Sequence, residues 1–134
     1  MDNKSKRRAV IIFIMVLIAA IHIFRVGNFL HGELFHYYYG YFSDFILPFG
    51  GYFLMCAAEQ QFPFLSRWKM KLAIAFLIPS IAETCQYFGV PVLGSTFDLL
   101  DYFMYALGAT LAAIFDTQVF SRLFIFWNIE KTER

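Results

Sequence analysis

Residues 9–24 read AVIIFIMVLIAAIHIF, an apolar run that directly follows a basic segment at residues 4–8. Its length is close to the roughly 20 residues that an α-helix needs to cross the hydrocarbon of a bilayer. The same flanks would suit a secretory signal peptide, but no convincing small-x-small cleavage site follows the run. We therefore expect a retained membrane anchor.

Three more apolar segments of similar length follow along the chain. The composition agrees with a membrane protein, because 60% of the residues are hydrophobic and only 16% are charged, outside the usual range of soluble domains. The net charge is +1 and the basic residues are scattered, so no nucleic-acid partner is indicated. We expect an all-α membrane protein, a four-transmembrane-helix bundle formed by residues 1–134 as a single integral membrane domain. The predicted spans are residues 9–25, 39–58, 70–88 and 98–115.

The segment after Asp116 has two interpretations. Residues 117–129 are too short and, with Arg122, too polar for a fifth span. On a helix, one face would carry Val119, Phe120, Leu123, Phe124 and Trp127. This pattern favours an interfacial helix lying along the membrane surface. A simple continuation of the fourth helix is the alternative.

The orientation follows from the basic residues, since cytoplasmic loops of membrane proteins are enriched in Lys and Arg. These residues gather before the first span, in the loop at residues 59–71 and in the C-terminal tail. The first predicted outer loop has only Arg25, and the second has none. We therefore expect a multi-pass protein in the lipid bilayer, with both termini in the cytoplasm.

Ionisable residues inside the predicted spans gather near the outer surface. Each costs about 2.5–3.5 kcal/mol near the bilayer centre, so each requires an explanation. Glu83 and Gln86 are three residues apart and share a helical face. On the next helix, spacings of three and four produce a stripe of polar and small residues suited to facing other helices, namely Asp98, Asp101, Tyr105, Gly108 and Ala112. Together these faces predict a carboxylate-rich pocket that opens to the outside. The residues predicted to form it are His22, Arg25, Asp44, Glu83, Gln86, Asp98, Asp101 and Tyr105.

A structural network would explain the same residues as well as a ligand site does. Asp98 could serve only to cap the fourth helix, because carboxylates favour helix N-termini. Arg25 could pair with one of the acids and hold the bundle together. At the other end, Glu59 and Asp116 fall at the inner boundary, and we expect the inner half of the spans to carry no comparable charge.

The stretch from Glu83 to Ala109, ETCQYFGVPVLGSTFDLLDYFMYALGA, places Glu-x-x-Gln before a short loop and Phe-Asp-x-x-Asp after it. It resembles the VanZ-like family and, more closely, a related group of small bacterial membrane proteins of unknown function. Residues 43–54, SDFILPFGGYFL, are similar to an earlier element of that family, in which Pro48 replaces a histidine. Ser95 replaces the arginine usual after the loop glycine. The matching positions are Asp44, Tyr52, Glu83, Gln86, Asp98, Asp101, Tyr105 and Gly108.

The resemblance implies a location in the bacterial cytoplasmic (inner) membrane. We expect the acidic pocket to bind a cell-envelope or lipid-linked ligand. The alternative is a small proton- or ion-coupled transporter, which would need a homo-oligomer because four helices form a thin pathway. An intramembrane enzyme is the least favoured reading, since only His22 lies near the acids. The sequence contains no motif that predicts a catalytic residue, a cofactor or a metal site.

Overall fold

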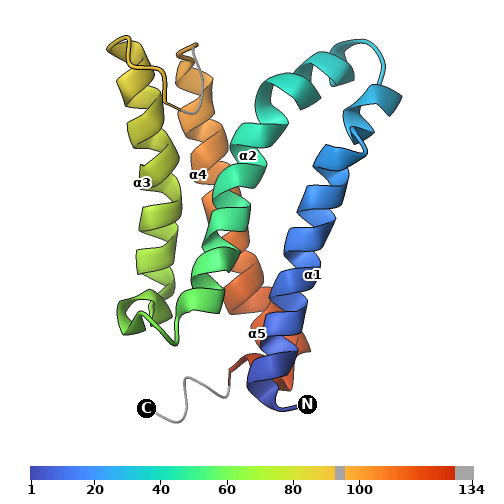
Figure 1. The fold of residues 1–134 in the computed structure, drawn as a ribbon, viewed down its shortest axis with the longest axis vertical. Coiled ribbons are helices and arrows are strands. Elements are labelled where there is room, and N and C mark those ends of the chain that lie inside the picture. Colours follow the sequence, from blue (N-terminus) through green and yellow to red (C-terminus); the bar gives the residue numbers. More distant parts are fainter. Residues whose placement is uncertain (93–95, 129–134) are drawn as a thin grey trace.

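Four long helices run up and down in the computed structural model of the chain (Figure 1). The structure describes residues 1–92 and 96–128. Ser95, the last residue of the predicted interfacial helix and the end of the basic tail therefore lie outside the described residues. The long helices are α1 (Asn3–Ile23), α2 (Glu33–Ala58), α3 (Trp68–Tyr87) and α4 (Leu99–Ile114).

Short turns connect and extend these helices, and the described residues contain no strand, so the all-α class is confirmed. The helix positions agree with the predicted segments, except that α1 already begins at Asn3 and α2 at Glu33. Within the described chain, two segments are long and apolar enough to cross a membrane, Glu33–Ala58 and Leu99–Leu123. The short elements are η1 (Val26–Phe29), η2 (Pro63–Ser66), η3 (Phe115–Phe120), α5 (Ser121–Leu123) and η4 (Ile125–Trp127).

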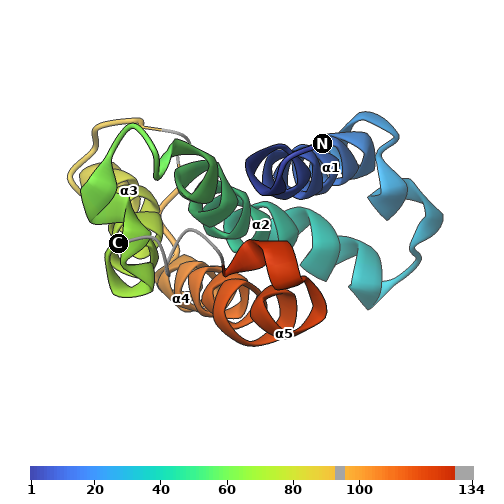
Figure 2. The ribbon, with the colours of Figure 1, turned by 90° about the horizontal axis from the view of Figure 1, so that it is seen from below.

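Helix α2 lies at the centre of the molecule and contacts each of the other three long helices (Figure 2). Its upper part bends away from α3 and α4 (Figure 1). Pro48 lies inside the helix. Proline cannot donate a backbone hydrogen bond to the carbonyl four residues earlier, which is that of Asp44, and it bends a helix at this point. The expected bend therefore lies next to Asp44, which is one of the predicted pocket residues.

Helix α4 packs on α2 through the predicted stripe of polar and small residues. Asp101, Tyr105, Gly108 and Ala112 of this stripe are all buried. Gly108 allows the closest approach, because a methyl group at this position would overlap the carbonyl oxygen of Phe45 in α2. Small residues at helix interfaces let backbones approach in this way.

The fourth helix continues beyond its predicted end. A wide π-helical turn at Phe115–Phe120 leads into α5, and helical structure ends only at Leu123. Phe124 then adopts an extended conformation, and the chain folds back so that Trp127 is buried. The prediction of a separate interfacial helix at residues 117–129 is therefore wrong. The alternative, a continued fourth helix, is correct as far as Leu123. The physical reason is a buried hydrogen bond of Trp127, described below.

Replacing Gly108 by alanine should lower the free energy of unfolding by about 1–3 kcal/mol, the usual cost of overpacking. The added methyl group must push α2 and α4 apart. Thermal unfolding in detergent, followed by circular dichroism, measures the change. Gly51→Ala is the matched control, because a methyl group there meets no atom within 4 Å. Equal melting temperatures for Gly108→Ala and the wild type would contradict the close approach.

Candidate functional site

A cavity of about 580 Å³ lies toward the end of the bundle where α1 meets α2 and where α3 meets α4, which we call the outer end after the predicted orientation. All four long helices contribute to its wall. Six of the eight residues predicted for the acidic pocket line it. The structure therefore brings together side chains that lie up to 83 positions apart in the sequence (from 22 to 105). The six are His22, Asp44, Glu83, Gln86, Asp101 and Tyr105.

Glu83 is the most enclosed of these acids, with 2% of its surface exposed. One carboxylate oxygen accepts a hydrogen bond from the backbone N–H of Asp98 at 2.7 Å. The other accepts one from the hydroxyl of Tyr105 at 3.3 Å, and that hydroxyl also lies 3.5 Å from Asp44. Glu83 thus fastens α3 to the start of α4 in addition to lining the cavity.

Asp101 differs from Glu83, because its carboxylate has no partner among the described residues. Only 9% of its surface is exposed, and its side chain lines the cavity. The amide nitrogen of Gln86 donates to the carbonyl of Val92 at 2.8 Å, while its amide oxygen is buried and accepts no hydrogen bond within the described chain. A buried acceptor without a donor is costly, and such groups require an explanation.

The two remaining predicted pocket residues do not line the cavity. Arg25 is exposed and adopts a left-handed conformation, with φ of 47°, in the turn where α1 ends. Asp98 caps α4, since its carboxylate accepts a hydrogen bond from the N–H of Leu100 at 2.9 Å. Its other oxygen lies 3.4 Å from the hydroxyl of Tyr41. The capping interpretation of Asp98 is therefore confirmed, and Arg25 is not brought into the cavity wall.

The described wall of the cavity includes the carboxylates of Asp44, Glu83 and Asp101 but no lysine or arginine. His22 lies on the α1 side, where its Nδ1 atom is 3.0 Å from the carbonyl of Ile18. Because its described wall holds three carboxylates and no lysine or arginine, the cavity attracts positively charged groups.

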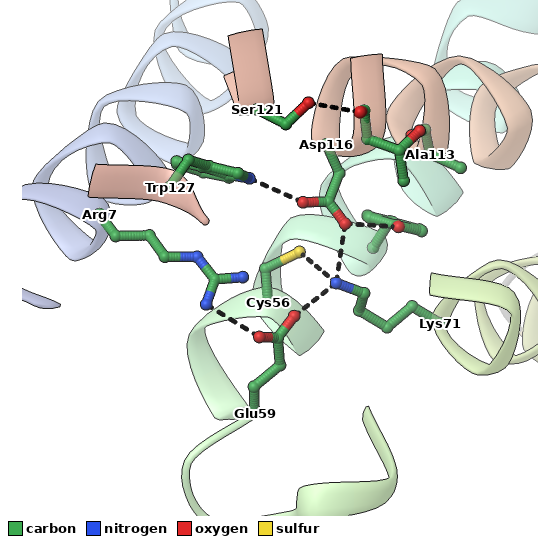
Figure 3. Close-up of polar contacts among 10 residues, drawn as sticks. Arg7, Cys56, Glu59, Lys71, Ala113, Asp116, Ser121 and Trp127 are labelled. Atoms are coloured by element: carbon green, nitrogen blue, oxygen red, sulfur yellow. Dashed lines mark hydrogen bonds and ion pairs between the residues drawn. The ribbon is translucent and has the colours of Figure 1, made fainter. Parts of the chain in front are cut away.

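The opposite end of the bundle, which we call the inner end after the predicted orientation, holds a second group of ionisable residues (Figure 3). The sequence interpretation missed that these residues are paired. The ammonium of Lys71 is at the centre of the group and is 1% exposed. It donates to Glu59 at 2.5 Å and to Asp116 at 2.9 Å, and it lies 3.1 Å from the sulfur of Cys56. Figure 3 shows these groups pointing toward one another from α2, α3 and the extension of α4. Glu59 and Asp116, which the sequence interpretation placed at the inner boundary, are thus buried and paired, and the sequence did not predict this pairing.

Asp116 accepts three hydrogen bonds, from Lys71, Tyr52 and Trp127. The hydroxyl of Tyr52 and the indole N–H of Trp127 each donate at 2.8 Å. The π-helical turn at Phe115–Phe120 contains Asp116, and such turns often occur where a side chain has a special role. The bond to Trp127 accounts for the backward fold of the chain after Leu123.

Arg7 brings the N-terminal end of α1 into the same group. Its guanidinium lies 2.8 Å from Glu59 and 5.1 Å from the centre of the Trp127 ring. Burial by itself would lower the pKa of Arg7, but the Glu59 carboxylate raises that pKa above its ordinary value, so the group stays charged. We call Arg7, Glu59, Lys71 and Asp116 the inner ion network. The sequence did contain a signal for this network. Glu59 and Asp116 stand at the ends of two predicted spans, at the same level as the basic residues Arg7 and Lys71 at the ends of the other two.

Replacing Lys71 by methionine should lower the free energy of unfolding by about 3–5 kcal/mol, because it leaves two buried carboxylates without their shared cation. Urea or thermal unfolding in detergent measures the loss. Lys69→Met is the matched control, since Lys69 is exposed. Adding Asp116→Asn to Lys71→Met should recover part of the stability. A Lys71→Met protein as stable as Lys69→Met would contradict this role of the network.

Comparisons of the chain with protein-family models, with curated proteins and with solved structures find no match.

Proposed function

We propose that the chain is a VanZ-like integral membrane protein of a bacterial cytoplasmic membrane, with four spans and both termini in the cytoplasm. Two of its helices qualify as spans by length and apolar character. Helices α1 and α3 accompany them, and both expose large apolar side chains that lipid would solvate, such as Phe13 and Ile78. Their basic residues Arg7 and Lys71 are paired with carboxylates, which lowers the cost of placing them near the bilayer.

The function supported best is the binding of a cell-envelope or lipid-linked ligand in the outer cavity. The observation that carries it is the convergence of six polar residues from four helices on one cavity. A purely structural network would pair each buried carboxylate with a cation, as the inner ion network does. The outer group instead contains Asp101, for which the described residues supply no partner. We assign the residues of the cavity to binding and none of them to catalysis.

The proposal predicts that the purified protein carries a bound small molecule from the cell envelope. Native mass spectrometry of protein prepared in a mild detergent would detect it as added mass. The double variant Asp44→Asn, Asp101→Asn should lose that mass while its melting temperature stays within a few degrees of the wild type. Glu33→Gln is the control, because Glu33 is an exposed acid outside the cavity wall. Wild-type protein without any bound molecule would contradict ligand binding, and loss of folded protein in the double variant would identify a structural network.

A second candidate function is a proton- or ion-coupled transporter acting as a homo-oligomer. The sequence interpretation lacked an acid in the inner half that could complete a proton relay. The inner ion network supplies two, Glu59 and Asp116, together with the hydroxyl of Tyr52. Intramembrane carboxylates commonly mark proton pathways in transporters.

The transporter candidate predicts a proton flux through reconstituted liposomes that contain a pH-sensitive dye. Asp101→Asn at the outer end and Glu59→Gln at the inner end should each reduce the flux to the level of empty liposomes. Glu33→Gln should leave it unchanged. A wild-type protein that gives no flux above empty liposomes under a pH gradient would exclude this candidate and leave ligand binding as the function.

A further inference from the structure

We propose that the outer cavity binds an amphiphile with a primary ammonium head group, and that Asp101 is the main partner of that ammonium. This inference rests on the proposed function, since it names the class of ligand for the same cavity. Three observations carry it: the charge of the cavity, the type of hydrogen-bonding group left open in its wall, and the position of its apolar wall.

The negative charge of the cavity favours a positively charged ligand. Asp44 is half-buried and Asp101 is nine-tenths buried, and both line the cavity. No lysine or arginine stands among the described lining residues. A buried carboxylate without a cation is costly, so a positively charged ligand that enters the cavity removes an unfavourable feature of the empty protein.

The open hydrogen-bonding groups are acceptors, which distinguishes between kinds of cation. Asp101 presents carboxylate oxygens that accept no hydrogen bond from any described residue. A primary ammonium supplies three N–H donors to such acceptors. A quaternary ammonium carries the same charge but supplies no donor.

The apolar part of the cavity wall favours a ligand that carries a hydrocarbon chain. Met15 and Ile18 of α1 and Leu47 and Leu54 of α2 line the cavity together with the acids. All four long helices supply lining residues, and these apolar ones come from α1 and α2. A lipid with its head group at Asp101 would therefore lay its chain along α1 and α2.

Hexadecylamine is the probe that tests this inference, added to full-length protein in a non-ionic detergent and measured by native mass spectrometry over a concentration series. We expect it to bind about tenfold more tightly than hexadecanol, which has the same chain and no charge, since a hydrogen bond to a charged group contributes about 1.5–3 kcal/mol. Asp101→Asn should weaken the binding of hexadecylamine by about the same factor. Glu33→Gln is the matched control and should bind like the wild type. Asp44→Asn provides a second test if Asp101→Asn lowers the yield of folded protein.

Three comparisons can overturn the parts of the inference separately. Equal binding of hexadecanol, or full binding by Asp101→Asn, would overturn the role of the charge. Equal binding of hexadecyltrimethylammonium would overturn the requirement for N–H donors. Butylamine bound as tightly as hexadecylamine would overturn the role of the chain.

The failure of this inference can be distinguished from failure of the proposed function. If hexadecylamine does not bind but a native molecule still accompanies the purified protein and is lost in the double cavity variant, only the ammonium inference is wrong. If neither the native molecule nor any probe binds, both are wrong. A native molecule that carries a primary amine and a long hydrocarbon chain would support both.

Discussion

The ammonium of Lys71 is held almost without contact with water, and the inner end of the bundle is organised around it. A buried charge of this kind is tolerated only when opposite charges and hydrogen bonds surround it. Glu59 and Asp116 provide the opposite charges, from the end of α2 and the extension of α4. Arg7 balances the second carboxylate, so the network contains two cations and two anions. Four segments are therefore fixed relative to one another by one electrostatic requirement.

The carboxylates at the two ends of the bundle differ in whether they are paired with a cation. At the inner end each carboxylate is paired with a cation, and Asp116 also accepts hydrogen bonds from Tyr52 and Trp127. At the outer end Glu83 is satisfied by the N–H of Asp98 and by Tyr105, while Asp101 faces the cavity without a described partner. The inner end consequently has the properties of a structural clamp, and the outer end has the properties of a binding site. This difference is the physical basis of the proposed function.

The outer cluster could be predicted because helical spacing and span direction place its members at one level. Spacings of three and four residues put Glu83 with Gln86, and Asp101 with Tyr105, on faces that the structure turns inward. The same reasoning failed for Arg25, because the position of an exposed side chain in a turn depends on local backbone angles that periodicity does not describe. It also failed for the inner ion network, since Arg7 and Lys71 were read only as basic flanks that set orientation. Their enclosure depends on Trp127, which returns to the bundle after the helix ends.

The sequence by itself determined the all-α class, the approximate position of each long helix, the stripe of small residues on α4 and the polar residues of the outer cavity. These properties follow from hydrophobic content and from the 3.6-residue period, which are local. Only the tertiary structure decided which charges are paired, where the fourth helix ends, and which acid is left open in the cavity. Those outcomes depend on contacts between residues far apart in the chain, such as Lys71 with Asp116 and Glu83 with the N–H of Asp98. Two buried charges pair only when the fold brings them within a few ångströms of each other. The periodic pattern of a sequence shows which residues share a helical face, but it does not show the distance between residues on different helices.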